Sequence, residues 1–258
     1  MGMADTELRV YLAGRIAGEA NGVVVINERD FRGQQDRLLF AYLVCERSRP
    51  VPREELADTL WPDGPPPAWQ TALNALVSRL RRLLDHGELR AFDAAVTQEF
   101  GQYQLRLPAA AWVDLEAAAA YLDQAEGALR AGEPRRAFGA ATVAAGIGAR
   151  PFLSGQDGPW VAGQRLRIER QRVRALECLA EVWLASGEPA LAVEAASQAL
   201  ALDPYRETAH QLLMRAYAGA GNPAQAVRAY QRLRELLVAE LGTDPSTATE
   251  ALYVELLG

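Results

Sequence analysis

Residues 61–84 read WPDGPPPAWQTALNALVSRLRRLL, a proline-rich turn that leads into a long amphipathic helix. Proline cannot continue a helix but is compatible with its first turn, so the segment predicts that one helix ends near Trp61 and another begins beyond Pro67. Apolar side chains recur in the second helix at spacings of three and four residues, the pattern of one buried face. That face carries Leu73, Leu76, Val77, Leu80 and Leu84.

The opposite face of this helix is polar. At about 100° per residue it carries Thr71, Asn74, Ala75, Ser78 and Arg82, with Arg79 and Arg81 at its edges. Small side chains permit close approach to DNA, asparagine and arginine read base edges in the major groove, and arginine also binds phosphate. A surface helix with ordinary solvated arginines would show the same pattern, so the flanking sequence has to decide between the two interpretations.

The elements around this helix are predicted in an order typical of DNA-binding proteins. The sequence predicts strands over 8–13 and 23–26 joined by a turn at Asn21-Gly22, helices over 31–47 and 51–61, the long helix, a short segment over 89–92, and a hairpin of 95–100 and 102–107 around Gly101. Strands, three helices and a hairpin make a winged helix, a helix-turn-helix variant whose third helix enters the groove. We also expect phosphate contacts from Arg53, Thr97 and Gln98, with plain solvation as the alternative.

Pro108 closes that unit, and the remaining sequence is alanine-rich and helical in pattern. Two stretches repeat with a period of 34 residues, which pairs Trp183 with Tyr217, Gly187 with Gly221, Pro189 with Pro223 and Ala192 with Ala226. A helix-turn-helix repeat of this length is the tetratricopeptide (TPR) signature. The expected fold is therefore mainly α, with a winged helix-turn-helix (α+β) over residues 1–108 and an all-α, TPR-like domain over 109–258. A long helix is predicted for 159–186, and a weaker copy of the repeat spans 129–141.

Composition narrows the function classes. The net charge is −6, and residues 1–108 carry 13 Arg against 15 Asp and Glu, so positive charge is local rather than general. The segment from Arg79 to Arg90 contains four arginines, these two included, and acidity elsewhere limits non-specific binding to DNA. No apolar run reaches about 18 residues and no signal peptide is evident. We therefore expect a cytoplasmic chain with no membrane contact.

Residues for catalysis or metal binding are scarce. His86 and His210 are isolated in the sequence, as are Cys45 and Cys178, and they form no triad, zinc-ligand spacing or disulfide framework. The carboxylates are scattered along helix faces, where they usually serve solubility. We expect no catalytic residues, no metal and no cofactor.

Five stretches of the chain together are similar to one family of regulators. They are FRGQQDRLLFAYLV (31–44), VPREELADTLWPDGPPPA (51–68), ALNALVSRLRRLL (72–84), GQYQLRLP (101–108) and AVRAYQRLRELLVAELGTDPS (226–246). On these motifs the chain resembles the SARP family (Streptomyces antibiotic regulatory proteins) over nearly its whole length. The resemblance implies a winged helix followed by a bacterial transcriptional activation domain (BTAD). It further implies binding to direct repeats in double-stranded DNA, contact with RNA polymerase, and protomers side by side.

Mapped onto this chain, the family's groove contacts fall on Thr71, Asn74, Ser78, Arg79, Arg81 and Arg82. Two positions depart from the pattern. Ser78 stands where related winged helices can carry a long basic side chain, and Glu99 lies at the expected wing tip with no arginine before Arg106. Both departures are expected to weaken the hold on phosphate. They motivate an alternative function, a TPR-type sensor module that captures a peptide or small molecule on the helical repeats and binds little or no DNA.

Overall fold

The computed structural model describes residues 7–85 and 87–257. His86 lies outside the described residues. The chain divides into two compact units. The first comprises the described residues up to Ala117 together with Arg150–Leu166, and the second comprises Ala118–Ala149 together with the described residues from Arg167 onward. Each unit is described by itself below.

The first unit begins with a four-stranded sheet in the order β3-β2-β1-β7. Its strands are β1 (Leu8–Tyr11), β2 (Ala17–Ala20), β3 (Val23–Ile26) and β7 (Trp112–Val113), the last pairing in parallel with β1. The predicted direct connection between β1 and β3 is wrong, because β2 lies between them and the Asn21-Gly22 turn connects β2 to β3. The sequence of β2, AGEA, lacks the β-branched and aromatic residues that mark a strand. Strand pairing on both sides overrides that weak propensity.

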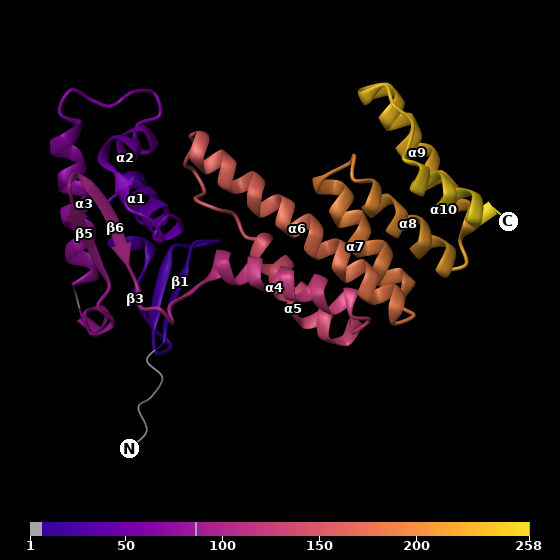
Figure 1. The fold of residues 1–258 in the computed structure, drawn as a ribbon, viewed down its shortest axis with the longest axis horizontal. Helices are drawn as coiled ribbons and strands as arrows, with labels where there is room; N and C mark the ends of the chain where they lie inside the picture. The colour runs from indigo at the N-terminus through magenta and orange to yellow at the C-terminus, as the bar shows by residue number, and fades with distance from the viewer. Residues whose placement is uncertain (1–6, 86, 258) are drawn as a thin grey trace, which may run out of the picture. The chain divides into compact units, whose positions relative to one another are not determined.

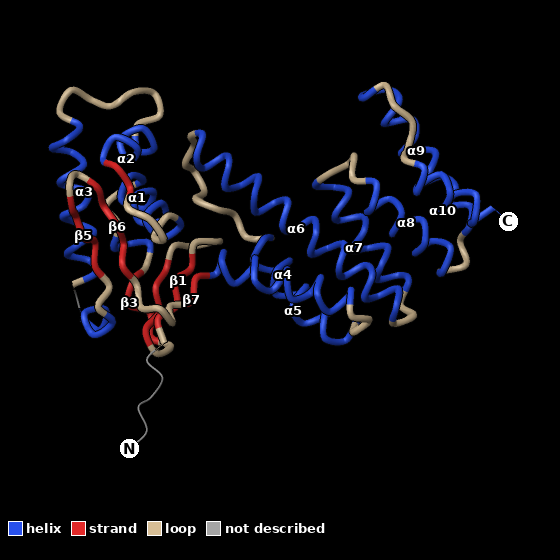
Figure 2. Tube along the Cα trace, in the orientation of Figure 1, coloured by secondary structure: helices blue, strands red, loops and turns tan. Residues whose placement is uncertain are grey.

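Three helices follow, and the predicted positions are confirmed. They are α1 (Gln34–Cys45), α2 (Arg53–Leu60) and α3 (Trp69–Leu84), preceded by the short helix η1 (Glu28–Asp30) and followed by η2 (Gly87–Phe92). The hairpin is also confirmed as β5 (Ala95–Glu99) and β6 (Gln102–Arg106), and β6 pairs as well with the two-residue strand β4 (Val51–Pro52). Figure 1 shows this hairpin beside α3, and Figure 2 shows its two strands in red.

The apolar face predicted for α3 forms the core of this winged helix. All five of its members are buried, none more than 4% exposed, and they meet the buried side chains of α1. Burying aliphatic side chains of this size stabilises a fold by about 1.5–3 kcal/mol each. The opposite face of α3 is thereby fixed outward within this unit.

The second unit consists of helices. They are α4 (Asp114–Arg130), α5 (Pro134–Gly148), α6 (Pro159–Ala185), α7 (Pro189–Leu202), α8 (Glu207–Gly219), α9 (Pro223–Leu241) and α10 (Thr247–Leu257), of which α4 and α6 begin in the first unit. Gly132, Gly187 and Gly221 close one helix of each predicted repeat with φ of 72°, 75° and 74°, a conformation that favours glycine. Three equivalent turns at the predicted places confirm the repeat. No helix in the described part of the chain is long and apolar enough to cross a membrane.

Candidate nucleic-acid interface

The polar face of α3 is open to solvent within the first unit. Thr71, Asn74, Ser78 and Arg82 are all exposed, as is the small Ala75 between them. Among the described residues, the Arg82 guanidinium has one hydrogen bond, from Nε to the Ser78 carbonyl one turn back at 3.4 Å. A helix whose outer face carries two short hydroxyls, an amide and an exposed guanidinium has the donors and acceptors that base edges require.

Asn74 is oriented by a residue on the hairpin. The hydroxyl of Tyr103, which is only 2% exposed on β6, donates a hydrogen bond of 3.2 Å to Oδ1 of Asn74. This bond uses one of the two lone pairs of Oδ1, which leaves the second lone pair and the NH₂ group of Asn74 available for other contacts. Sequence reasoning missed Tyr103 as a partner of the site, because strand alternation marks it only as an inward-facing residue.

Arg79 is held by α1. It makes an ion pair with Asp36, with Nη2 at 2.8 Å and Nε at 3.0 Å from Oδ1, and the Asp36 side chain is 10% exposed. Asp36 also accepts a bond of 3.1 Å from the backbone N–H of Arg32. The guanidinium of Arg79 is therefore turned toward the protein, unlike that of Arg82.

Arg81 and the predicted hairpin residues form one cluster. Nε of Arg81 donates to the Val96 carbonyl at 3.0 Å, and its Nη2 lies 3.5 Å from Oε1 of Gln98. Thr97 donates instead to the Gln104 carbonyl within the hairpin, at 3.3 Å. The structure thus brings Arg81 and Gln98 together at an exposed edge of α3, whereas the hydroxyl of Thr97 is engaged in the hairpin itself.

Arg53 lies at the start of α2, next to the hairpin turn. Its backbone N–H donates to the Gly101 carbonyl at 3.2 Å, and its exposed guanidinium pairs with Glu54 at 2.8 Å. The hydrogen bond to Glu54 raises the pKa of Arg53, and Arg53 in turn lowers the pKa of Glu54. A phosphate would have to compete with this carboxylate, although an exposed ion pair of this kind is weak.

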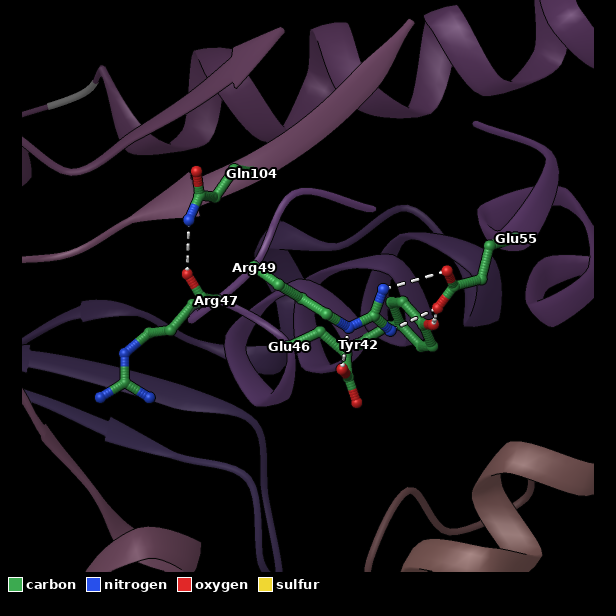
Figure 3. A network of polar contacts seen from close by, with 6 residues as sticks. All are labelled: Tyr42, Glu46, Arg47, Arg49, Glu55 and Gln104. Atoms are coloured by element: carbon green, nitrogen blue, oxygen red, sulfur yellow. Dashed lines mark hydrogen bonds and ion pairs between the residues drawn. The ribbon is translucent and has the colours of Figure 1, made fainter. Parts of the chain in front are cut away.

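A polar network behind the site holds the hairpin sheet and the helices together (Figure 3). Arg49 bridges Glu46 and Glu55, at 2.8 Å and 3.0 Å, and the hydroxyl of Tyr42 donates to the same Glu55. Burial and then that hydrogen bond raise the pKa of Tyr42 to about 12, so the hydroxyl stays protonated. On the other side, Gln104 donates to the Arg47 carbonyl at 3.0 Å. These contacts fix α1, α2 and β6 relative to one another.

The fold and this outward-facing helix define the class of protein by its architecture: an N-terminal winged helix followed by a helical-repeat domain. The family described as "Bacterial transcriptional activator domain" matches residues 113–257, more than half of the chain. The chain therefore belongs to that family, and it is a SARP-type regulator carrying a BTAD.

Individual relatives agree with this assignment. The chain is 33% identical over 223 residues to Regulatory protein AfsR of Streptomyces coelicolor and 30% identical over 223 residues to Regulatory protein AfsR of Streptomyces griseus. Each alignment covers 86% of this chain but only 22% of the relative, so the chain spans about a fifth of their length. The solved structure of Mycobacterium tuberculosis EmbR in complex with a low-affinity phosphopeptide is similar with a TM-score of 0.84 and 25% identity, over 98% of this chain and 65% of that one.

Proposed function

We propose that this chain binds specific double-stranded DNA through the exposed face of α3 and activates transcription from nearby promoters. In this proposal residues 1–108 bind the DNA, and residues 109–258 contact RNA polymerase. The observation that carries it is the division of α3 into two faces, one wholly buried and the other presenting Thr71, Asn74, Ser78 and Arg82.

The roles of the predicted contacts follow from their surroundings. In this proposal Asn74, Ser78 and Arg82 read bases, and their exposure on one stripe of the helix supports that role. Arg81 with Gln98, and Arg53 beside the hairpin turn, would hold phosphates. Arg79 acts indirectly, since its bidentate pair with Asp36 fixes the angle between α1 and α3.

Direct-repeat recognition and protomers side by side belong to the same proposal. The chain is similar to the regulatory protein AfsR, and its resemblance to the SARP family implies binding sites arranged as direct repeats. Each protomer would then place one copy of α3 in the major groove of one repeat.

The test begins with selection of a duplex. The full chain is used to enrich sequences from a random double-stranded library, and the enriched duplex is then titrated by fluorescence anisotropy. Arg82→Ala should weaken binding by about 1–3 kcal/mol, whereas Arg136→Ala, which removes an exposed arginine of α5 that pairs with Glu133, should leave it unchanged. Failure to enrich any sequence at low salt with folded protein would overturn the proposal.

Activation is tested separately by reconstituted transcription. Templates with and without the enriched sequence upstream of a promoter are transcribed by bacterial RNA polymerase in the presence of the chain. The proposal predicts more transcript only from the template that carries the sequence. If both templates give equal amounts of transcript while the chain still binds the DNA, the activator role is rejected and the proposed DNA recognition stands.

A second candidate function is capture of a peptide or small molecule by the helical unit. A polar pocket of about 290 Å³ is lined there by residues of α4 and α6 and by Arg206. Its walls carry two ion pairs, Arg174 with Glu126 at 2.7 Å and Arg206 with Glu177 at 2.9 Å. Burial, and then the charge of Glu177, raises the pKa of Glu181 beside them. Thermal-shift screening of charged metabolites and short peptides tests this candidate. If no compound raises the melting temperature, this candidate function is rejected.

A further inference from the structure

One face of α6 carries charges of both signs in two separate groups. Arg167, Arg170 and Arg174 follow one another at spacings of three and four residues, and Glu177 and Glu181 come next along the same helix. At about 100° per residue, all five lie within about 60° of Arg174 around the helix axis. These five residues form the charged stripe of α6.

Helix stability does not account for the order of charges in this stripe. Like charges three or four residues apart on a helix repel each other and destabilise it. Arg170 has Arg167 and Arg174 at those distances, and Glu181 has Glu177. Because both halves of the stripe carry this cost, the pattern indicates a ligand with the complementary order of charges.

The middle of the stripe is paired within the protein. Arg174 donates to Glu126 of α4 through Nε and Nη2, both at 2.8 Å. Glu177 accepts from Nε and Nη2 of Arg206, at 2.9 Å and 3.0 Å. These two bidentate pairs neutralise the centre of the stripe and leave its ends for other partners.

The two ends of the stripe have no partner of opposite charge in contact. Arg167 and Arg170 at one end and Glu181 at the other are exposed. None of the three makes an ion pair with another residue in the described part of the chain. A ligand that reaches both ends would therefore form ion pairs without breaking any.

The acidic end opens into a pocket that suits a basic side chain. Glu181 lines the polar pocket of about 290 Å³ at α4 and α6. Burial, and then the charges of Glu126, Glu181 and Glu177, raises the pKa of Cys178 in the pocket wall to about 12. The three carboxylates thus surround one neutral thiol, and a ligand cation placed there meets negative charge from both helices.

The distance between the free ends sets the length of the ligand. Arg170 and Glu181 are eleven residues apart on α6, which corresponds to about 16 Å at about 1.5 Å per residue. An extended peptide covers that distance in about five residues. A DNA backbone does not suit the stripe, because phosphates are negative along the whole strand and the acidic end repels them.

We infer that the charged stripe binds an extended peptide segment with acidic residues at one end and a lysine or arginine about five residues away. The acidic side chains would pair with Arg167 and Arg170, and the basic side chain would enter the pocket against Glu181. The inference rests on the second candidate function, ligand capture by the helical unit, and selects an extended peptide as the ligand. It does not depend on DNA recognition.

A set of defined peptides tests the length and the charge order. Each fluorescein-labelled peptide has capped ends, two adjacent aspartates and one lysine in a glycine and serine background, with the separation varied and both chain directions included. The peptides are titrated against the full chain at low salt by fluorescence anisotropy. In at least one direction, binding should be tightest when the lysine lies about five residues from the nearer aspartate. It should be at least about tenfold weaker when they are adjacent or when serine replaces the lysine. Equal binding at every separation, or no binding, would overturn the inference.

Charge exchange between chain and peptide shows whether the peptide lies along the stripe. Glu181→Arg should weaken binding of the best peptide by about tenfold, and a peptide with glutamate in place of lysine should bind this variant as well as the original pair bind. Arg170→Glu should be rescued in the same way by lysines in place of the aspartates. Glu169→Arg is the matched control, because Glu169 is an exposed residue on the opposite side of α6, and binding should be unchanged. If neither exchange restores binding, the peptide does not lie on the stripe and the inference is wrong.

The same variants separate this inference from the proposed functions. If Arg167→Ala and Arg170→Ala weaken binding to the library-selected duplex but not to the peptide, the basic end contacts DNA and the inference is overturned. If the defined peptides fail but another compound raises the melting temperature in the thermal-shift screen, ligand capture stands and only the extended peptide is rejected. If no duplex is selected, DNA recognition fails, and the peptide titrations still decide this inference.

Discussion

At the scale of single residues, the ion pair between Asp36 and Arg79 stabilises the winged helix. Asp36→Ala removes the acceptor of four hydrogen bonds and leaves a half-buried guanidinium unpaired. The expected cost is about 2–3 kcal/mol in the free energy of unfolding, measured by urea denaturation. Asp85→Ala is the matched control, because Asp85 pairs with Arg90 at 3.6 Å with both side chains exposed, and such a pair contributes about 0–1 kcal/mol. If the two substitutions lower the free energy of unfolding equally, the ion pair between Asp36 and Arg79 does not have the stabilising role assigned to it.

His210 gives stability a defined pH dependence. Burial lowers its pKa below the ordinary value of 6.5, as does Arg232, against the raising effects of the Pro204 carbonyl at 2.9 Å and of Glu207. The unfolded chain therefore takes up the proton first as the pH falls. Stability attributable to His210 is complete above about 6.5 and declines as the pH drops through the folded-state pKa.

Comparison with a non-titrating variant isolates that effect. His210→Gln keeps a donor for the Pro204 carbonyl but cannot be protonated. The stability advantage of the natural chain over this variant should shrink between pH 7.5 and pH 5, by at most about 1.4 kcal/mol per pH unit. Parallel curves for the two proteins in urea denaturation would show that His210 keeps its ordinary pKa.

At the scale of elements, α3 and the hairpin act together through Tyr103. Tyr103→Phe removes only the hydroxyl that holds Asn74, and we expect DNA affinity to fall by about 0.5–1.5 kcal/mol. The effect should vanish in a chain that already carries Asn74→Ala, because the hydroxyl then has no side chain to orient. If Tyr103→Phe lowers DNA affinity by the same amount in the chain that carries Asn74→Ala, the Tyr103 hydroxyl does not act through Asn74 and contributes to packing of the hairpin instead.

The elements themselves were largely predictable from the sequence, but their contacts were not. Periodicity identified α3 and both of its faces because five leucines and valines repeat at helical spacing. It could not identify β2, whose residues acquire strand conformation only through pairing with both neighbours, or β7, two residues that pair with a strand about 100 positions earlier.

At the candidate site, too, the positions of side chains on the helix were predictable from the sequence and their contacts were not. Helix geometry placed Asn74, Ser78 and Arg82 outward, as the structure has them. The same geometry put Arg79 at the edge of that face, and only the structure shows that Asp36, 43 positions away, binds it. Partners distant in sequence leave no periodic signal, so Tyr103 was also missed. The part of Asn74, Ser78 and Arg82 in DNA binding stays a prediction.

At the scale of the whole molecule, acidity limits how much of the affinity can come from phosphates. The chain carries a net charge of −6, and the arginines proposed to contact phosphates reduce to Arg53 and Arg81, because Arg79 is paired and Arg82 is proposed to read bases. Two contacts per protomer predict a slope of about −2 in a plot of log K against log salt concentration. A slope steeper than about −6 per protomer would mean that a further basic surface binds DNA.

The central claim is that the outer face of α3 reads bases, and Asn74 tests it most directly. Binding of the natural chain and of Asn74→Ala is measured on the library-selected duplex and on a panel of duplexes with single base-pair changes. The account predicts that one base-pair change, costing the natural chain about 1–3 kcal/mol, costs the variant almost nothing, while all other changes keep their cost. If Asn74→Ala retains full discrimination at every position, α3 does not read the sequence through this face and the account is wrong.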